Sequence, residues 1–329
     1  MRRYDIVSIG DTTIDAFLEL HEASVHCALD HSNCQLCFTF ADKIPYDRLT
    51  MLPAGNSTNN AVGSSRLGLK TAFVSAVGND EHGRMIITEL KKEKIDTKFI
   101  NINQKAQTNF HVVLSFQGER TILIKHNKFE YNLPAKLDTD WVYFSSMASG
   151  TESFHKQLSQ VLHKQPKVKL AFNPGTFQLR MDSTKLRDLY KRTEVVFVNR
   201  EEAELILKVQ TKSIQTLLKG LHKLGARYVV ITDGRDGSYA SNGSGPIWYI
   251  EEFGGPKIES TGAGDAYATA FTAALYYGKP ISEAMIWGTI NAGHVVQFVG
   301  PHAGLQTKTQ IETHIRKHPN FKAHQISNI

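Results

Sequence analysis

The chain has 329 residues, of which 41% are hydrophobic and 21% charged, which is typical of a globular protein with a large core. No apolar run approaches the roughly 18 residues of a membrane span, and the start of the chain lacks the apolar core of a signal peptide. We therefore expect a cytoplasmic protein without a membrane partner. The net charge of +6 suits anionic small ligands, whereas the scattered lysines and arginines argue against nucleic acid as a partner.

Short β-branched runs alternate with helical patterns along most of the chain. Strands are expected at residues 5–10, 72–77, 141–144, 169–172, 195–198 and 228–232. Helices are expected at residues 59–67, 83–93, 153–163 and 214–224. Because the strands are almost continuously apolar and alternate with helices, the pattern predicts an α/β fold with a mainly parallel sheet covered by helices on both faces.

Two regions interrupt this alternation with pairs of strand patterns. The first pair lies at residues 14–20 and 35–41, and the second at residues 109–116 and 120–126, where Gln117-Gly118-Glu119 reads as a hairpin turn. Hairpins do not fit a doubly wound sheet, so they predict a small β layer that projects from it. We expect a lid formed by residues of about 12–50 and 107–128 within a single domain that spans 1–329.

A glycine-rich turn at residues 260–265 (STGAGD) opens a helix of small residues. Its glycines let the backbone bend tightly and let a ligand approach the N–H groups. A helix N-terminus leaves N–H groups unpaired and carries partial positive charge, so this turn is a candidate anion site. Asp265 would repel an anion there, which suggests that it has a chemical task, such as general base in phosphoryl transfer. The alternative is an acidic residue that only stabilises the helix dipole.

The same stretch, extended to residue 259 (ESTGAGD), resembles the D-T-x-G-A-G-D signature of the ribokinase-like (PfkB) carbohydrate kinase family. The resemblance implies a ribokinase-like three-layer α/β/α fold with a mainly parallel central sheet and a small β-sheet lid. It also implies that Asp265 is the base that deprotonates the acceptor hydroxyl. Gly262, Ala263 and Gly264 would form the anion hole for the transferred phosphoryl group.

Polar residues near the start of the chain match the family's acceptor site. Asp11 follows the first strand, and Asp15 lies four residues later, at the end of the sheet where ligands of α/β proteins bind. Residues 54–61 (AGNSTNNA) resemble the family's G-G-x-x-x-N-x-A signature. There Gly55 would allow close approach, and Asn56 and Asn59 would bind hydroxyls. Several family members have lysine where this chain has Asn56, which argues against a phosphorylated acceptor. Turn and helix-cap roles are the alternatives.

The resemblance places the nucleotide site at the ends of the later strands. Asn199 and Glu202 match the family's N-x-x-E motif, with Glu202 acting on Mg²⁺ through water, although acidic residues are also common in the first turn of any helix. The remaining matches are Thr232, Gly234 and Gly237. Asn291 on a late helix is a weaker match, and Arg120 in the second hairpin is another candidate for the nucleotide. A guanidinium group binds phosphate bidentately, although a solvated hairpin arginine is equally compatible with the pattern.

All three cysteines fall within eleven residues, between the strands of the first pair. Cys27, Cys34 and Cys37 are interleaved with histidines, among them His26 and His31. Three thiolates and one histidine would complete a tetrahedral zinc site that staples a segment with little core of its own. Buried thiols or a redox pair are the other interpretations that the sequence leaves open.

Together these motifs predict an ATP-dependent kinase that phosphorylates a hydroxymethyl group of a sugar and uses Mg²⁺. A nucleoside kinase of the same family is the alternative, and a sugar- or nucleotide-binding regulator without activity is a further one. Glu259 stands where the family has aspartate, so a requirement for K⁺ at this position stays open. Exposed lid strands often pair with one another, so the sequence is compatible with a homodimer formed through the lid.

Overall fold

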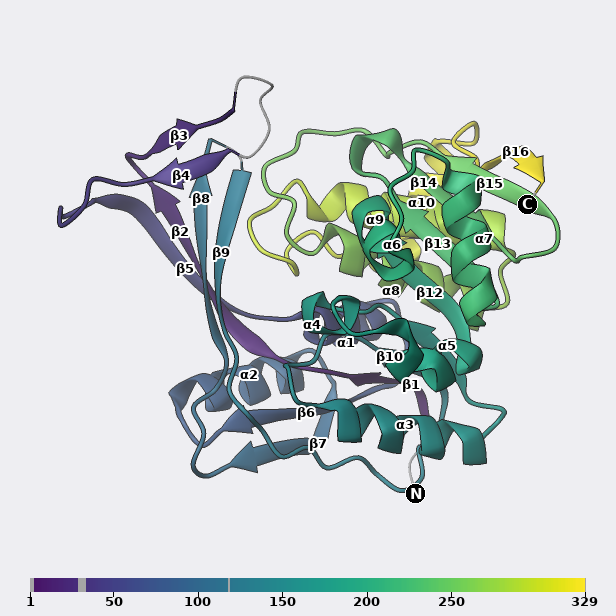
Figure 1. Ribbon diagram of the computed structural model, residues 1–329, viewed down its shortest axis with the longest axis horizontal. Coiled ribbons are helices and arrows are strands. Elements are labelled where there is room, and N and C mark those ends of the chain that lie inside the picture. Colours follow the sequence, from purple (N-terminus) through teal and green to yellow (C-terminus); the bar gives the residue numbers. More distant parts are fainter. Residues whose placement is uncertain (1–2, 29–33, 118, 329) are drawn as a thin grey trace.

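The structure, a computed structural model, describes residues 3–28, 34–117 and 119–328. Over these residues the chain forms an α/β/α body from which a small β-sheet projects (Figure 1). The fold class expected from the sequence is confirmed. Within these ranges no helix has the length and apolar character needed to cross a membrane.

The central sheet has ten strands in the described part of the chain. From one edge to the other they are β16 (His324–Asn328), β15 (Pro246–Ile250), β14 (Ser238–Ser241), β13 (Tyr228–Thr232), β12 (Thr193–Asn199), β11 (Lys169–Phe172), β10 (Thr139–Phe144), β1 (Tyr4–Ile9), β6 (Thr71–Gly78) and β7 (Asp96–Asn103). All pairs from β13 to β7 are parallel, whereas β14, β15 and β16 add an antiparallel edge. The carboxyl ends of the parallel strands therefore point to one side of the body.

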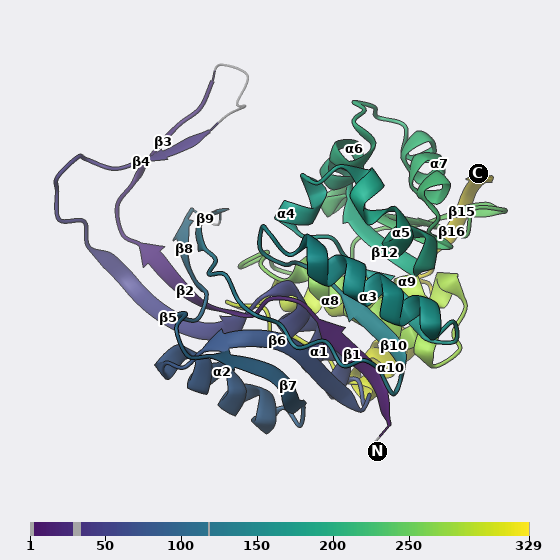
Figure 2. The same cartoon turned by 60° about the horizontal axis from the view of Figure 1, so that its bottom comes forward.

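Helices cover both faces of this sheet (Figure 2). One face packs against α3 (Glu152–Lys164), α5 (Arg187–Arg192), α6 (Arg200–Leu207) and α7 (Ile214–Leu224). The other face packs against α1 (Asn56–Arg66), α2 (Glu81–Lys92), α8 (Ala263–Tyr276), α9 (Ile281–Val295) and α10 (Lys308–Lys317). Short turns of helix lie in the loops as α4 (Thr176–Leu179), η1 (Ser183–Leu186) and η2 (Gly234–Asp236). Strand side chains point alternately to the two faces, so Val7 and Ser8 meet opposite helix layers.

The projecting sheet has four strands in the described residues, in the order β5 (Tyr46–Ala54), β2 (Thr13–Leu20), β8 (Phe110–Phe116) and β9 (Glu119–Lys125). Three of them agree with the expected strand patterns, but residues 35–41 do not join this sheet. Instead β5, which the sequence analysis did not anticipate, pairs with β2 along its whole length. Because β2 starts only four residues after β1 ends, the projecting sheet grows directly out of the centre of the body.

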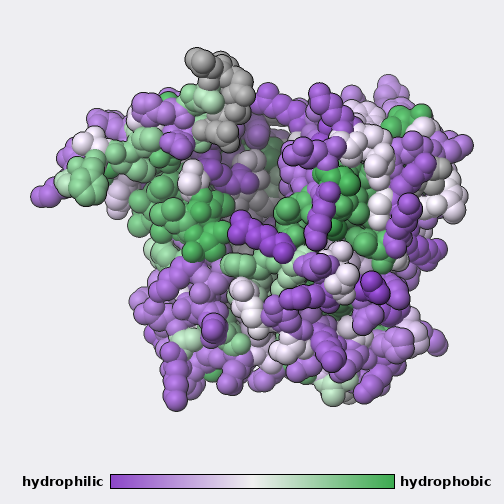
Figure 3. Space-filling view, in the orientation of Figure 1, coloured by the Kyte–Doolittle hydropathy of each residue, from purple (hydrophilic) through white to green (hydrophobic). Residues whose placement is uncertain are grey.

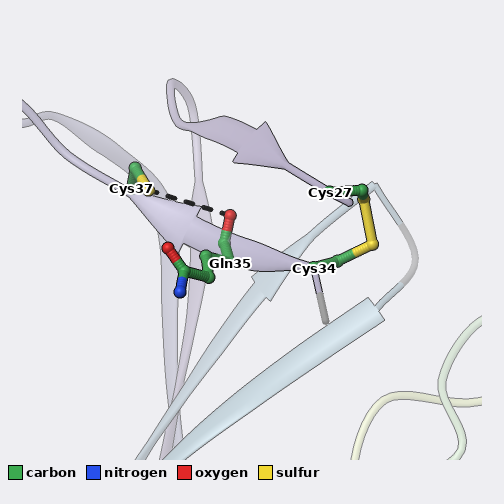
Figure 4. The surroundings of a disulfide bond; sticks show 4 residues. All are labelled: Cys27, Cys34, Gln35 and Cys37. Carbon is green, nitrogen blue, oxygen red and sulfur yellow. Dashed lines mark hydrogen bonds between the residues drawn. A yellow bond between two sulfur atoms is a disulfide. The ribbon is translucent and has the colours of Figure 1, made fainter. Parts of the chain in front are cut away.

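The cysteine segment forms a separate hairpin beyond the projecting sheet, made of β3 (Ser24–His26) and β4 (Gln35–Cys37). A disulfide joins Cys27 to Cys34 at its end (Figure 4). Oxidised sulfurs are not the thiolates that zinc requires, and the described residues contain no group of three His, Cys, Asp or Glu that could hold a metal ion. The three-thiolate zinc site expected from the sequence is therefore wrong for this structure.

The remaining thiol of the hairpin is Cys37, whose Sγ donates to the carbonyl oxygen of Gln35 at 3.9 Å (Figure 4). Of the two candidate histidine ligands, His26 has its Nε2 atom 3.3 Å from the hydroxyl group of Ser24. His31 lies outside the described residues. The arrangement seen for Cys27 and Cys34 is that of an oxidised pair, which the sequence had left open.

Candidate active site

Two adjoining cavities lie at the carboxyl ends of the parallel strands. The first, of about 360 Å³, is lined by the projecting sheet, by α1 and by the segments that follow β1, β11 and β12. The second, of about 490 Å³, lies beside the ends of β13 and β15 and against α8 and α9. Thr232, Ser260, Gly264 and Tyr267 line both cavities. The cavities therefore meet at the start of α8, which is the glycine-rich turn singled out in the sequence.

The turn before α8 depends on Gly262, which caps the helix in the left-handed conformation (φ 80°). A Cβ atom there would lie 2.6 Å from the Cβ atom of Pro301, so this position excludes other residues. At Gly264 a Cβ atom would meet nothing within 4 Å, because the residue faces the junction of the cavities. In the first helical turn the N–H of Ala263 donates to the carbonyl oxygen of Ser260 at 3.3 Å, whereas the N–H groups of Gly264 and Asp265 have no helical partner and can receive an anion at this junction.

Asp265 lies in the first turn of α8 and lines the first cavity, with 8% of its surface exposed. Asn59 of α1 donates an amide hydrogen bond to its Oδ2 atom at 2.7 Å. Asn173, which follows β11, donates to its Oδ1 atom at 3.3 Å. The pKa of Asp265 is raised to about 7, chiefly by burial and also by the neighbouring carboxylates of Glu202 and Asp15, against the lowering effect of the Asn59 hydrogen bond. A carboxyl group with this pKa exchanges protons near neutral pH, as a general base must.

Two carboxylates at the base of the projecting sheet line the other end of the first cavity. Asp11 accepts hydrogen bonds from the hydroxyl group of Tyr131 and, at 2.8 Å, from the backbone N–H of Ala148. The Nδ1 atom of His126 lies 3.2 Å from Oδ2 of Asp11. The expected acceptor residue Asp11 is thus held rigidly in the wall of this cavity.

Asp15 lies on β2, and its Oδ1 atom is 3.2 Å from Nδ1 of His111 on β8. Apart from this approach, Oδ1 of Asp15 and Nε2 of His111 are buried without a hydrogen-bond partner among the described residues, so both have hydrogen-bonding capacity left for a ligand hydroxyl group. His111 and His126 were not anticipated from the sequence. The only signal for them is their place in the projecting sheet, since His111 lies on β8 and His126 directly follows β9.

The residues expected from the G-G-x-x-x-N-x-A signature also line the first cavity. Gly55 precedes α1, and Asn56 and Asn59 lie in its first two turns. Phe177, which follows β11, stands edge-on to the ring of His126 and closes this end of the cavity. The structure therefore brings together all five residues expected at the acceptor, although no motif had suggested Phe177.

Asn199 and Glu202 form a capping box at the start of α6, in which each side chain accepts from the other residue's backbone N–H, at 2.7 and 2.9 Å. Both residues line the first cavity on the side of Asp265. Burial raises the pKa of Glu202, and Glu201 adds to this effect. A divalent cation beside Glu202 would offset that cost, since Mg²⁺ takes one or two carboxylates together with water and phosphate oxygens.

Thr232, Gly234 and Gly237 line the second cavity, as expected for the nucleotide side. Gly237 adopts φ 83°, and a Cβ atom there would lie 2.2 Å from the carbonyl oxygen of Ile250, so glycine is required. Asn291 does not line either cavity. Its side chain donates to the carbonyl oxygen of Ala266 at 2.8 Å and accepts from the N–H of Gln306 at 2.9 Å, which ties α9 to α8.

The face of α9 that reaches the second cavity carries Thr289, Ala292, Gly293 and Val296 instead. Helical periodicity explains the difference, because Asn291 points into the contact between α9 and α8, whereas Thr289, Ala292 and Gly293 reach the cavity. Phe253 lines the same cavity and contacts His294, His314, His318 and Phe321 through its ring.

Arg120 extends from β9 to the loop that leads into α8. Its Nη1 atom donates to the hydroxyl group of Ser260 and lies 3.5 Å from Oε1 of Glu259. Glu259 also accepts from the N–H of Thr261 at 2.7 Å and from that of Gly300 at 3.1 Å. Arg120, which the sequence analysis assigned to the nucleotide, thus lines the first cavity and not the second, and its charge is already paired with Glu259. Gly118 of the expected hairpin turn lies outside the described residues.

Comparison with known proteins supports this geometry over nearly the whole chain. Residues 5–308 match the profile of the pfkB family of carbohydrate kinases. The chain belongs to this family. It is accordingly a sugar kinase, a phosphotransferase with an alcohol acceptor. As a family member it is 27% identical to a 5-dehydro-2-deoxygluconokinase of Bacillus licheniformis, over 94% of this chain and 95% of the relative. It is 26% identical to a ribokinase of Haemophilus influenzae, over 78% of this chain and 85% of the relative.

Solved structures of this PfkB family share the fold. A nucleoside kinase of Methanocaldococcus jannaschii, described as an archaeal member of the ribokinase family, superposes with a TM-score of 0.76 at 19% identity, covering 95% of this chain and 98% of that one. The ribokinase of Arabidopsis thaliana, solved with ribose and ATP, gives a TM-score of 0.76 at 18% identity over 95% and 98% of the two chains.

Proposed function

We propose that this PfkB family kinase transfers the γ-phosphoryl group of ATP to a hydroxymethyl group of an uncharged sugar, with Asp265 as the general base. The observation that carries the proposal is the position of Asp265, a buried carboxyl group of pKa about 7 where the two cavities meet. A hydroxyl group in the first cavity would lose its proton to Asp265 as it attacks the phosphoryl group at the start of α8.

The residues around the junction suit this chemistry. The backbone at Gly262, Ala263 and Gly264 would neutralise the charge on the transferred group without reorganising, because its N–H groups are fixed by the helix. Thr232, Gly234 and Gly237 would hold the nucleotide in the second cavity. Magnesium, when bound beside Glu202 and the phosphates, supplies further positive charge.

The charges of the first cavity favour an acceptor without an anionic group. Asp11, Asp15 and Asp265 all line it. Among the lining residues that the structure describes, Arg120 is the only lysine or arginine, and it is paired with Glu259. A phosphate or carboxylate on the acceptor would have to displace that pair, whereas neutral hydroxyl groups can donate to Asp11 and Asp15.

A coupled assay of ATP consumption tests the proposal. The panel contains pentoses and hexoses, their aldonates and phosphates, and nucleosides, each supplied with ATP and Mg²⁺. We expect turnover with one or more neutral sugars and weak turnover with their anionic counterparts. A nucleoside acceptor is the second candidate, because Phe177 offers a ring beside the cavity on which a base can stack. If no acceptor stimulates ATP consumption while ligands still bind, the protein is a regulator.

The projecting sheet would serve as the lid over the acceptor, for which the sequence predicted residues of about 12–50 and 107–128. Its strands also carry exposed apolar side chains, among them Leu49 and Leu123. Figure 3 shows hydrophobic surface over this part of the molecule. We infer that two chains pair through this surface, since exposed sheet edges with apolar side chains favour association. Light scattering should give the native protein the mass of two chains and the Leu123→Glu variant the mass of one. A native protein with the mass of a single chain would contradict this inference.

We infer a cytoplasmic location, because the proposed reaction consumes ATP. The disulfide between Cys27 and Cys34 is an exception in that location, because disulfides rarely persist in a reducing cytoplasm. The hairpin that carries them lies outside both cavities, and neither cysteine lines them.

A further inference from the structure

His302 lies in the loop between α9 and α10 and does not line either cavity. Its Nε2 atom is 3.0 Å from Oδ1 of Asn59, the residue whose amide group donates to Asp265. A continuous path of two hydrogen bonds therefore runs from His302 through Asn59 to the carboxyl group of Asp265. None of the motifs in the sequence includes His302.

The direction of these bonds follows from the chemistry of the amide group. An asparagine oxygen only accepts and its nitrogen only donates. Since Nδ2 of Asn59 donates to Asp265, Oδ1 of Asn59 must face a donor, and His302 supplies it only in the tautomer that carries hydrogen on Nε2. If His302 accepted instead, the amide would turn over and present its oxygen to Asp265. That arrangement suits only the protonated carboxyl group, which is not a base.

Two further residues hold His302 in place. Arg66, at the end of α1, donates through Nη1 to the carbonyl oxygen of His302. The same guanidinium group makes a bidentate pair with Glu93, at 2.6 Å from Nη2 to Oε1 and 3.1 Å from Nε to Oε2. Such fork-like pairs fix both partners in orientation. The loop that carries His302 is thus attached to α1, the same helix that carries Asn59.

The protonation state of His302 fits this role. Burial lowers its pKa to about 4, and the charge of Arg66 adds to the effect while Glu93 opposes it. The imidazole is therefore neutral over the whole range in which Asp265 titrates. Asp265 itself faces the carboxylates of Glu202 and Asp15 in addition to the amide of Asn59.

We propose that His302 is a positioning residue for the base: its Nε2–H donates to Asn59, which fixes the Asn59 amide so that it donates to Asp265 and stabilises the ionised carboxylate. This inference rests on the proposed function, in which Asp265 is the base. His302 touches neither the acceptor nor ATP. Its effect should therefore appear in the protonation of Asp265 and in turnover, and hardly in ATP binding.

The test compares His302→Leu with His302→Gln. Leucine removes the donor at similar volume, whereas the glutamine amide nitrogen can replace Nε2–H. In His302→Leu we expect kcat to fall by roughly 10-fold to 100-fold, the usual cost of misplacing a reacting group. The midpoint of the acid limb of its pH–kcat profile should shift to higher pH by about half to one unit, because a weakened hydrogen bond to the carboxylate favours the protonated form. His302→Gln should recover most of both effects, and KM for ATP should stay the same.

A second readout does not depend on activity. The pKa of Asp265 can be followed by ¹³C NMR of labelled aspartate carboxyl groups, with the resonance assigned from its loss in Asp265→Asn. We expect a higher pKa in His302→Leu than in the native protein. The matched control is His222→Leu on α7, which removes another partly buried imidazole, one that contacts the carbonyl oxygen of Ala226 and lies outside both cavities. The control should change neither the profile nor the resonance.

The outcomes separate this inference from the proposed function. An active His302→Leu variant with native pH profile and native Asp265 pKa overturns the role of His302 and leaves the kinase reaction intact. Equal losses in His302→Leu and His302→Gln would also overturn it, because they would indicate a packing role. If the native protein phosphorylates no acceptor, the proposed function fails, while the NMR titration still decides whether His302 sets the protonation of Asp265.

Discussion

Arg120 of the projecting sheet pairs with Glu259, the residue that begins the loop into α8, at 3.5 Å between Nη1 and Oε1. Glu259 is 6% exposed, and both of its oxygens already accept backbone N–H groups. A buried carboxylate requires a compensating charge. Here a side chain from the projecting sheet provides it, and the pair joins that sheet to the turn that would hold the phosphoryl group.

This pair predicts how the enzyme responds to monovalent cations. Because Arg120 already compensates Glu259, the native protein should turn over equally fast in KCl and NaCl. Arg120→Ala should lower kcat/KM for the acceptor roughly 10-fold or more, since it leaves a buried charge unpaired, and K⁺ or guanidinium should restore part of the loss. Arg48→Ala, which breaks an exposed pair with Glu19 on the same sheet, is the control. Strong activation of the native protein by K⁺ would contradict this prediction.

Asp265→Asn should preserve the fold and ATP binding while lowering kcat by roughly 10²–10⁴, the usual effect of removing a positioned base. Asparagine keeps the size of the side chain and can still accept from Asn59, but it cannot take a proton. Steady-state kinetics with the acceptor found in the screen measures the loss. Turnover within about three-fold of the native rate would exclude Asp265 as the base.

The raised pKa of Asp265, about 7, predicts two opposite dependences on pH. Activity should rise as pH increases through about 7, because only the ionised carboxylate is a base. The free energy of unfolding should fall as pH rises from about 3.8 to about 7. In this range the folded protein keeps a proton on Asp265, whereas the unfolded chain, with the ordinary pKa of 3.8, has lost it. The effect is at most about 1.4 kcal/mol per unit of pKa shift.

Denaturant unfolding of the native protein and of Asp265→Asn from pH 4 to pH 8 measures this second dependence. The variant lacks the titrating group, so the difference in unfolding free energy between the two proteins should change with pH in favour of the variant. Parallel stability curves for the two proteins over this range would show that Asp265 does not carry the raised pKa.

Asp15→Ala should chiefly raise KM for the acceptor. Its Oδ1 atom is buried without a hydrogen-bond partner and would accept from a hydroxyl group of the sugar. Losing that bond costs about 1–3 kcal/mol, which corresponds to roughly 5-fold to 150-fold in KM. Asp47→Ala removes an exposed carboxylate of β5 that contacts His21 and should leave the acceptor KM unchanged. If Asp15→Ala altered KM for ATP alone, the acceptor would lie elsewhere.

Replacing Cys27 and Cys34 by serine should leave kcat and both KM values within about two-fold of native, because the hairpin that they close lies outside both cavities and exposed substitutions have small effects. Treatment of the native protein with a reductant should give the same result. Elemental analysis of the purified native protein should find no stoichiometric zinc. One zinc per chain, lost in the serine variant, would reinstate the metal site.

The sequence was sufficient for the parallel part of the fold because its strands are short apolar runs bounded by turns. Helix α7 and strand β13 have the expected bounds, and β11 does too. The antiparallel edge was missed since β14 and β16 are polar, and β5 since Asp47 and Pro53 interrupt its apolar pattern. Edge strands are held by pairing with a neighbour, which local composition does not record.

For the site, local motifs identified the residues that lie next to glycine turns and strand ends. Motifs did not reveal His111, His126 or Asn173, because each becomes part of the site only through a distant partner. The assignment of Asn291 went wrong for a related reason, since the motif placed it on the correct helix but could not say which side faces the cavity.

The first cavity draws its acceptor end from residues up to Phe177, whereas every residue that lines the second cavity comes from Thr232 or later. The hydrogen bond between Asn59 and Asp265 joins these two parts of the chain at the proposed reacting centre. Mutations in the first half of the gene can therefore change which acceptor is bound, while the residues that line the second cavity, encoded in the second half, stay the same. Chimeras that exchange the first 178 residues between relatives, with Asn59 retained, offer a direct route to altered acceptor choice in the laboratory.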